Sequence, residues 1–309
     1  MAPTIDIIRH AQAHHNLAGS NIPDPRLTSQ GSRECIDLQA RFKELDSGEN
    51  ITHVISSPMR RAIETSSTIV ELAKDDTKIT LFAYLQEVNA TPSSTGTGLQ
   101  ELLDSYPYLS FDADTLNEDW YRKGPDTPFA PDAAKVENRA LIARIFLRDA
   151  AREAVSKGQP NAHIVVVTHG EFAHWLTDDF AGIGYHRNSG WHNAEIRSYQ
   201  FLNLEDTEGA PLVETPNSLQ RRNATAAMLL SDGEKVNMKR IASIRVQQHA
   251  ANYAERMQQE REARGLEEGE EWVDVDEEEA DKENTEPRRL HPNIRRRLAL
   301  AHSNRTRHS

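Results

Sequence analysis

The sequence predicts an α/β protein with a mostly parallel central sheet, helices on both faces, a helical C-terminal extension and a charged tail. In the first 205 residues, short β-branched apolar runs alternate with longer stretches of helical periodicity. Residues 163–168, HIVVVT, are apolar at nearly every position, as in a strand that is buried on both faces. Strands that alternate with helices form parallel βαβ units, so we expect a sheet covered on both sides.

The expected elements follow the chain in order. The strands are 4–8, 53–56, 79–82, 163–168 and 197–204, and the helices are 28–45, 60–73, 133–155 and 171–180. Asp132 stands where it would cap the helix 133–155, on which Val136, Ala140, Ala143 and Leu147 share one face. Residues 88–131 carry most of the local Pro, Gly, Ser and Thr, so they predict a long, partly helical insertion.

The composition changes after residue 215. We therefore divide the chain into a main domain, 1–215, a helical extension, 216–265, and a disordered tail, 266–309. The extension has a weak apolar stripe of Met238, Ile241, Ile244 or Arg245, Gln248 and Ala251. The tail joins an acidic block, 267–286, to a basic block, 287–309, and such blocks of like charge rarely fold.

The composition also narrows the function classes. The net charge is -12, and an acidic main body argues against nucleic acid as a partner. The chain contains no run of about 18 apolar residues, so we expect neither a spanning helix nor a membrane partner. The single cysteine, Cys35, excludes an internal disulfide framework. We expect a cytoplasmic protein, with the nucleus as the alternative because the tail is basic; the oligomeric state is left open.

Polar side chains follow four predicted strands at the point where each strand ends. Arg9 and His10 follow the first strand, residues 57–61 the second, Glu87 the third and His169 the fourth. The carboxyl ends of parallel strands meet at one edge of a sheet, where ligands bind. Guanidinium groups match phosphate oxygens, a neutral imidazole is a nucleophile, and a carboxyl group moves protons. The sequence therefore indicates phosphoryl-group chemistry.

These residues lie in ordered segments that resemble the histidine phosphatase superfamily, which has the phosphoglycerate mutase-like three-layer fold. The matching segments are Ile8-Arg9-His10-Ala11-Gln12, Leu27-Thr28-Ser29-Gln30-Gly31, Ser57-Pro58-Met59-Arg60-Arg61-Ala62, Leu85-Gln86-Glu87 and Val167-Thr168-His169-Gly170. Arg-His-Ala in the first segment, with the later Gly190-Trp191-His192-Asn193, is more similar to a fungal and plant branch. The matches run across residues 4–204 in the order that the family has them.

The resemblance implies a hydrolysis in two steps. His10 attacks phosphorus and forms a phosphohistidine, while Arg9, Arg61 and His169 stabilise the charge on the phosphoryl oxygens. Glu87 protonates the leaving oxygen and then activates the water that cleaves the intermediate. The implied activity is that of a phosphatase acting on a small phosphomonoester.

Further residues have supporting roles by the same resemblance. Asn16 adds a phosphate contact, and Ser57 helps to position the arginines. We expect no metal and no other cofactor, because cationic side chains supply the charge. His14 and His15 lie close to His10, but their spacing does not match a standard zinc pattern.

Two other functions stay open at this point. A phosphoglycerate mutase is one, although the substrate loop of those mutases is missing after the first motif; a non-catalytic phosphate-binding protein is the other. Glu171 stands where the family often has glycine, and its carboxylate would repel phosphate or bind a cationic part of a substrate. Residues 120–123 either contact the leaving group or anchor the insertion.

Overall fold

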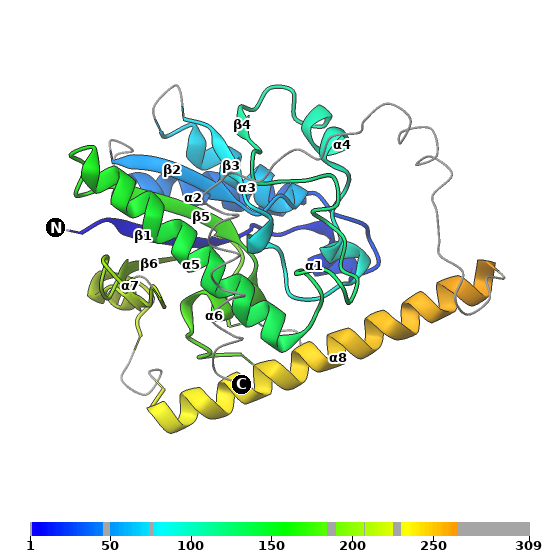
Figure 1. The fold of residues 1–309 in the computed structure, drawn as a ribbon. Coiled ribbons are helices and arrows are strands. Elements are labelled where there is room, and N and C mark those ends of the chain that lie inside the picture. The colour runs from blue at the N-terminus through cyan, green and yellow to red at the C-terminus, as the bar shows by residue number, and fades with distance from the viewer. Residues whose placement is uncertain are drawn as a thin grey trace.

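The computed structural model describes residues 2–45, 50–73, 77–183, 190–206, 208–224 and 230–264 (Figure 1). The predicted disordered tail, 266–309, lies outside the described residues. The division of the chain at residue 215 stays a prediction.

A seven-stranded sheet runs through the described part of the protein in the order β4-β3-β2-β5-β1-β6-β7. Its strands are β1 (Thr4–Arg9), β2 (Ile51–Ser56), β3 (Ile79–Leu81), β4 (Phe111–Asp112), β5 (His163–Thr168), β6 (Ile196–Phe201) and β7 (Leu212–Glu214). The first five are parallel to one another, whereas β6 is antiparallel to β1 and β7 is antiparallel to β6. The mixed, mostly parallel sheet confirms the predicted fold class.

The helices of the described residues surround this sheet. They are α1 (His14–Ala18), α2 (Ser29–Leu45), α3 (Arg60–Val70), α4 (Leu99–Asp104), α5 (Ala133–Ser156), α6 (Gly170–Thr177), α7 (Pro216–Arg221) and α8 (Asp232–Arg264), with short 3-10 turns η1 (Ala83–Leu85) and η2 (Pro92–Ser94). The connections through α2 and α3 lead from β1 to β2 and from β2 to β3, toward the β4 edge of the sheet. The connection through α5 leads from β4 back to β5. Right-handed crossovers therefore put α5 on the opposite face from α2 and α3.

The core explains why the central elements were predictable. The apolar side chains of β5 are 0% exposed, as expected for a strand with helices on both faces. In α5, Val136, Ala140, Ala143 and Leu147 are buried, and Asp132 accepts a hydrogen bond from the Lys135 amide at 2.9 Å as the expected cap. None of the helices in the described ranges is both long and apolar enough to span a bilayer.

Three short elements were not expected. The edge strands β4 and β7 have only two and three residues, which is too few for an alternating pattern to be recognised. Helix α1 lies in a polar segment to which the sequence analysis assigns no element, and none of its residues is buried. Helix formation there depends on Asn16, whose side-chain oxygen accepts a hydrogen bond from the Ala13 amide at 2.9 Å.

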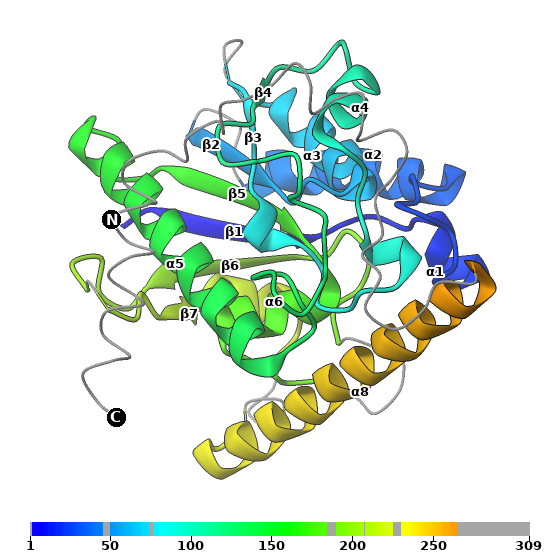
Figure 2. The ribbon, with the colours of Figure 1, turned by 45° about the vertical axis from the view of Figure 1, so that its right-hand side comes forward.

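Helix α8 is one long helix that lies beside α5 and α6 in both views (Figures 1 and 2). Ala242 and Val246 are fully buried in the contact, whereas Ile244 is 43% exposed. The predicted stripe was therefore displaced by about one residue, because charged residues occupy part of the buried face. Lys239 contacts Glu137 of α5 at 2.8 Å and Asp178, directly after α6, at 3.1 Å.

Candidate active site

The loops after β1, β2 and β5 bring His10, Arg61 and His169 together. The His10 and His169 rings lie with their centroids 5.2 Å apart, and both side chains are almost completely buried. The His10 amide donates to the Thr168 carbonyl at 2.9 Å, which continues the β1–β5 pairing by one residue and fixes the loop. Nδ1 of His10 lies 2.8 Å from the Ala11 carbonyl. Since a carbonyl only accepts, Nδ1 carries the proton and Nε2 keeps its lone pair.

His169 is held by two partners that fix its tautomer. Arg61 Nη2 donates to His169 Nδ1 at 3.1 Å, so the ring proton is on Nε2. Nε2 in turn donates to the Ser57 hydroxyl at 2.8 Å. Arg61 also donates through Nη1 to the Ser93 carbonyl of the insertion at 2.7 Å. Ser57 therefore contacts the second histidine, and Arg61 joins that histidine to the insertion.

Burial and neighbouring cations keep both histidines neutral. Burial lowers the pKa of His10 well below its ordinary 6.5, and the charges of Arg61 and Arg9 lower it further. The pKa of His169 is lowered well below 6.5 for the same reasons, burial first and Arg61 next. Burial also lowers the pKa of Arg61 to about 10, which leaves the guanidinium charged near neutral pH. The cluster thus combines two neutral imidazole rings with fixed positive charge.

Arg9 is held at the end of β1 by the residues around Trp191, shortly before β6. Its Nη1 donates to the Trp191 carbonyl, while Asn193 donates to the His10 carbonyl at 3.0 Å. Within the described residues, the Nε atoms of Arg9 and Arg61 are buried without a hydrogen-bond partner. The two guanidinium groups therefore keep donors for an oxyanion.

Glu87 lies beside the first turn of α6. Its Oε1 accepts hydrogen bonds from the Phe172 amide at 3.1 Å and from the Val88 amide at 3.0 Å. Its charge raises the pKa of Arg9 and of Arg61, against the larger lowering by burial, so the carboxylate lies near both guanidinium groups. The structure thus places a partly buried carboxylate next to the histidine and arginine cluster.

Asn16 differs from the other predicted site residues, which are buried or partly buried. Its side chain is exposed, its oxygen caps α1, and its Nδ2 is 3.4 Å from Nε2 of His15. His15 lies beside the buried cluster, because its ring centroid is 5.5 Å from that of His10. Burial, Arg61 and Arg9 lower the pKa of His15 to about 3, so it faces the site as a neutral ring.

Trp120 and Lys123 bring the insertion into the site. Trp120 is 1% exposed, and its backbone carbonyl accepts a hydrogen bond from the Gln86 side chain at 2.7 Å. Trp120 therefore anchors the insertion. Lys123 is 3% exposed, and its Nζ donates to the Glu87 carbonyl at 2.9 Å. Arg139 of α5 also donates to that carbonyl, at 3.4 Å. Sequence reasoning missed Arg139, although an arginine between Val136 and Ala140 on an apolar helix face is a signal of buried pairing.

Glu171 is bound by α8. Its carboxylate lies 3.3 Å from Nε of Arg245 and 3.1 Å from Nε2 of His249, and the residue is 3% exposed. The carboxylate is thus paired with side chains of α8, and the two roles expected for it toward a substrate stay predictions. Within the described residues, no group of three or more His, Cys, Asp or Glu side chains is placed to hold a metal ion.

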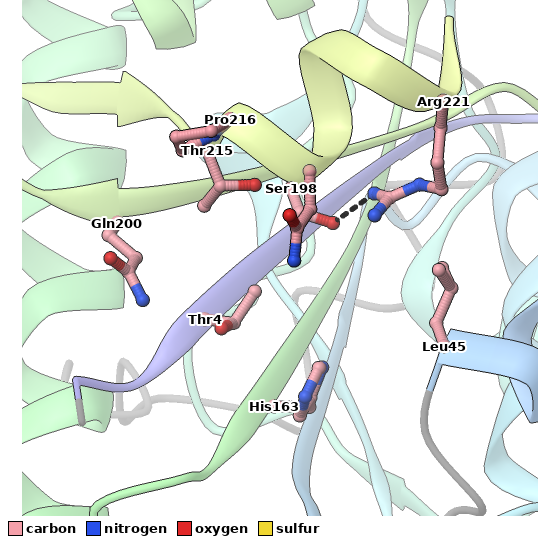
Figure 3. Close-up of a pocket in the computed structure, with 9 residues that line it drawn as sticks. Thr4, Leu45, His163, Ser198, Gln200, Thr215, Pro216 and Arg221 are labelled. Atoms are coloured by element: carbon pink, nitrogen blue, oxygen red, sulfur yellow. Dashed lines mark hydrogen bonds between the residues drawn. The ribbon is translucent and has the colours of Figure 1, made fainter.

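A cavity of about 380 Å³ lies at the other end of the sheet, where β1 and β5 begin (Figure 3). Asp6 is buried beneath it and lies 2.6 Å from Nδ1 of His163. The Ser198 hydroxyl donates to Asp6 at 2.6 Å and accepts from Arg221 at 2.7 Å. This network links β5, β1 and β6 in the interior of the sheet, and it is separate from the His10 cluster because it lies toward the amino ends of β1 and β5.

A family model matches most of the chain. Residues 5–217 match the family described as Histidine phosphatase superfamily (branch 1). No curated protein matches the chain in sequence. Among solved structures, the ecdysone phosphate phosphatase of Bombix mori is similar with 13% identity and a TM-score of 0.46, covering 69% of this chain and 92% of its own.

Two further solved structures have comparable similarity. A phosphoserine phosphatase from Entamoeba histolytica has 19% identity and a TM-score of 0.38, covering 69% of this chain and 95% of its own. A mycobacterial glucosyl-3-phosphoglycerate phosphatase has 16% identity and a TM-score of 0.42, covering 69% of this chain and 98% of its own. The family match extends over most of the chain and includes every segment that supplies the cluster, so the protein belongs to the histidine phosphatase superfamily.

Proposed function

We propose that this protein is a metal-independent phosphatase that hydrolyses a small phosphomonoester through a phosphohistidine on His10. The observation that supports it most is the convergence of His10, Arg61 and His169 at the carboxyl ends of β1, β2 and β5. Nδ1 of His10 is bound to the Ala11 carbonyl, which leaves Nε2 as the nucleophilic atom.

In the first step, Nε2 of His10 forms a bond to phosphorus while the bond from phosphorus to the leaving oxygen breaks. Glu87, protonated at this stage, gives its proton to that oxygen. Arg9 and Arg61 stabilise the charge on the other phosphoryl oxygens, because their guanidinium groups are fixed before the reaction begins.

In the second step, a water molecule attacks the phosphohistidine. The Glu87 carboxylate takes a proton from this water, a new oxygen–phosphorus bond forms, and the nitrogen–phosphorus bond breaks. His10 is neutral again at the end, as its strongly lowered pKa favours. Glu87 has regained its proton, so the enzyme returns to its starting state with inorganic phosphate and an alcohol as products.

The test is hydrolysis of p-nitrophenyl phosphate in the presence of EDTA, with the His10→Ala variant beside the wild type. We expect EDTA to leave the wild-type rate unchanged and His10→Ala to lower kcat by at least ~10³-fold, because the nucleophile is lost. His14→Ala is the matched control, since this neighbouring side chain is exposed. An inactive wild type, or a His10→Ala variant as active as the wild type, would refute the proposal.

A further inference from the structure

The backbone that carries Glu87 is held by side chains at three consecutive carbonyl groups. The Thr168 hydroxyl donates to the carbonyl of residue 85 at 2.8 Å, and Arg139 Nη1 donates to that of residue 86 at 3.0 Å. Lys123 Nζ donates to the carbonyl of Glu87 itself at 2.9 Å. Leu85 ends η1 and residues 86 and 87 lie outside any regular element, so these carbonyls have no helix or sheet partners, and side chains replace them.

This arrangement determines where the Glu87 carboxylate lies. Its Oε1 accepts a hydrogen bond from the Phe172 amide in the first turn of α6, and His169 is the N-cap of that helix. The main chain of Glu87 is bonded on one side by Lys123, and its carboxylate is bonded on the other by α6. A shift of the carbonyl would therefore move the carboxylate relative to the Nε2 atom of His10.

Lys123 is an unusual residue to find in this place. A lysine that is only 3% exposed is rare, because removing an ammonium group from water is costly. Burial, with Arg139 next, lowers the pKa of Lys123 well below its ordinary 10.5, and Glu87 opposes this effect. An amine keeps an N–H for the Glu87 carbonyl in either protonation state. The insertion thus brings a buried donor to a single backbone atom of the acid-bearing segment.

We propose that Lys123 is a positioning residue for Glu87, so that the insertion sets the geometry of proton transfer to the leaving group. This inference rests on the proposed function. It predicts that loss of the amine impairs the reaction most where the leaving group needs a proton. A misplacement of about 1 Å costs up to roughly 10²-fold in rate, so we expect a loss of about 10- to 100-fold.

The experiment compares two substrates in each enzyme. Phenyl phosphate has a poor leaving group that needs an acid, whereas 2,4-dinitrophenyl phosphate has a good one that does not. Phenolate release in a single turnover, with enzyme in excess over substrate, reports the first step alone. We expect Lys123→Met to slow this release with phenyl phosphate about 10- to 100-fold and with the dinitrophenyl ester less than about 3-fold. Glu87→Gln should show the same pattern.

The matched control is Lys135→Met. Lys135 also donates from Nζ to backbone carbonyls of the insertion, one of them Thr127 at 2.9 Å, but it does not bind the Glu87 segment. We expect this control to behave as the wild type with both substrates. The ratio of the two rates does not depend on the folded fraction, because both substrates react with the same molecules. Lys123→Gln, which is too short to reach the carbonyl, is a second variant should Lys123→Met fail to fold.

Four outcomes would overturn the inference. An equal loss with both substrates in Lys123→Met would mean that Lys123 has a structural role only. The same leaving-group pattern in Lys135→Met would mean that any loosening of the insertion has this effect. A wild type that releases no phenolate from either ester would overturn the proposed function and this inference together, whereas an active wild type with an unaffected Lys123→Met would overturn this inference alone.

Discussion

Asp24 carries a buried charge, and its replacement by asparagine should stabilise the protein near neutral pH. The residue is 3% exposed. Its Oδ1 accepts from the Arg60 amide at 3.1 Å, but Oδ2 is buried without a hydrogen-bond partner among the described residues. Burial raises the pKa of Asp24 from its ordinary 3.8 to about 6, although Arg61 and Arg60 oppose the rise. The folded protein therefore binds this proton more tightly than the unfolded chain does.

The magnitude follows from linkage. Since the folded pKa is the higher one, the stabilisation is fully present below pH 3.8 and is lost as the pH rises through about 6. The difference between the two pKa values corresponds to about 3 kcal/mol. Between pH 7.5 and pH 4.5, the wild type should regain about 2 kcal/mol of this at Asp24. Asp24→Asn cannot titrate, so it lacks this gain and should be more stable than the wild type at pH 7.5 by up to about 3 kcal/mol.

The assay is urea unfolding, followed by circular dichroism, of wild type and Asp24→Asn at both pH values. The advantage of the variant at pH 7.5 should exceed its advantage at pH 4.5 by about 2 kcal/mol. Asp37→Asn, at an exposed position of α2, is the control and should change the stability by less than about 0.5 kcal/mol. A difference between Asp24→Asn and wild type that does not change with pH, or that changes in the opposite direction, would refute the reasoning.

Two further predictions concern packing and charge outside the reacting groups. A Cβ at Gly31 would lie 2.0 Å from the Gln12 carbonyl oxygen, so Gly31→Ala should lower the free energy of unfolding by about 1–3 kcal/mol. Gly98→Ala, where nothing lies within 4 Å, should not; equal losses in urea unfolding would contradict the clash. Arg245→Met removes the guanidinium that pairs with buried Glu171 and should cost about 2 kcal/mol, between the values for surface and buried pairs. Adding Glu171→Gln should restore most of this loss in the same assay, and a double variant no more stable than the single one would count against the pairing.

The central part of the fold could be predicted because its signals are local. The apolar run 163–168 coincides with β5, and Asp132 marks the start of α5. His10 and His169 could be named because motifs at the carboxyl ends of parallel strands must converge. The structure does bring them together with Arg61, although their roles in catalysis stay predictions.

The insertion and the edges of the sheet could not be predicted in the same way. Lys123 lies in a segment without periodicity, and its burial depends on the distant Glu87 carbonyl, which no local pattern indicates. In α8, the buried face includes Arg245 and His249, so apolar spacing alone places the stripe wrongly. The antiparallel direction of β6 depends on the path of the chain after α6, and the strand's own residues do not encode it.

The contact between α8 and Glu171 limits where this chain can be shortened. A shortened protein that ends near residue 217, where the family match stops, would strip two salt-bridge partners from a carboxylate two positions beyond His169. It would also expose the apolar surface against which Ala242 and Val246 pack. In this protein α8 packs against the rest of the described structure through these contacts. Truncation where the family match stops should therefore yield an aggregation-prone fragment.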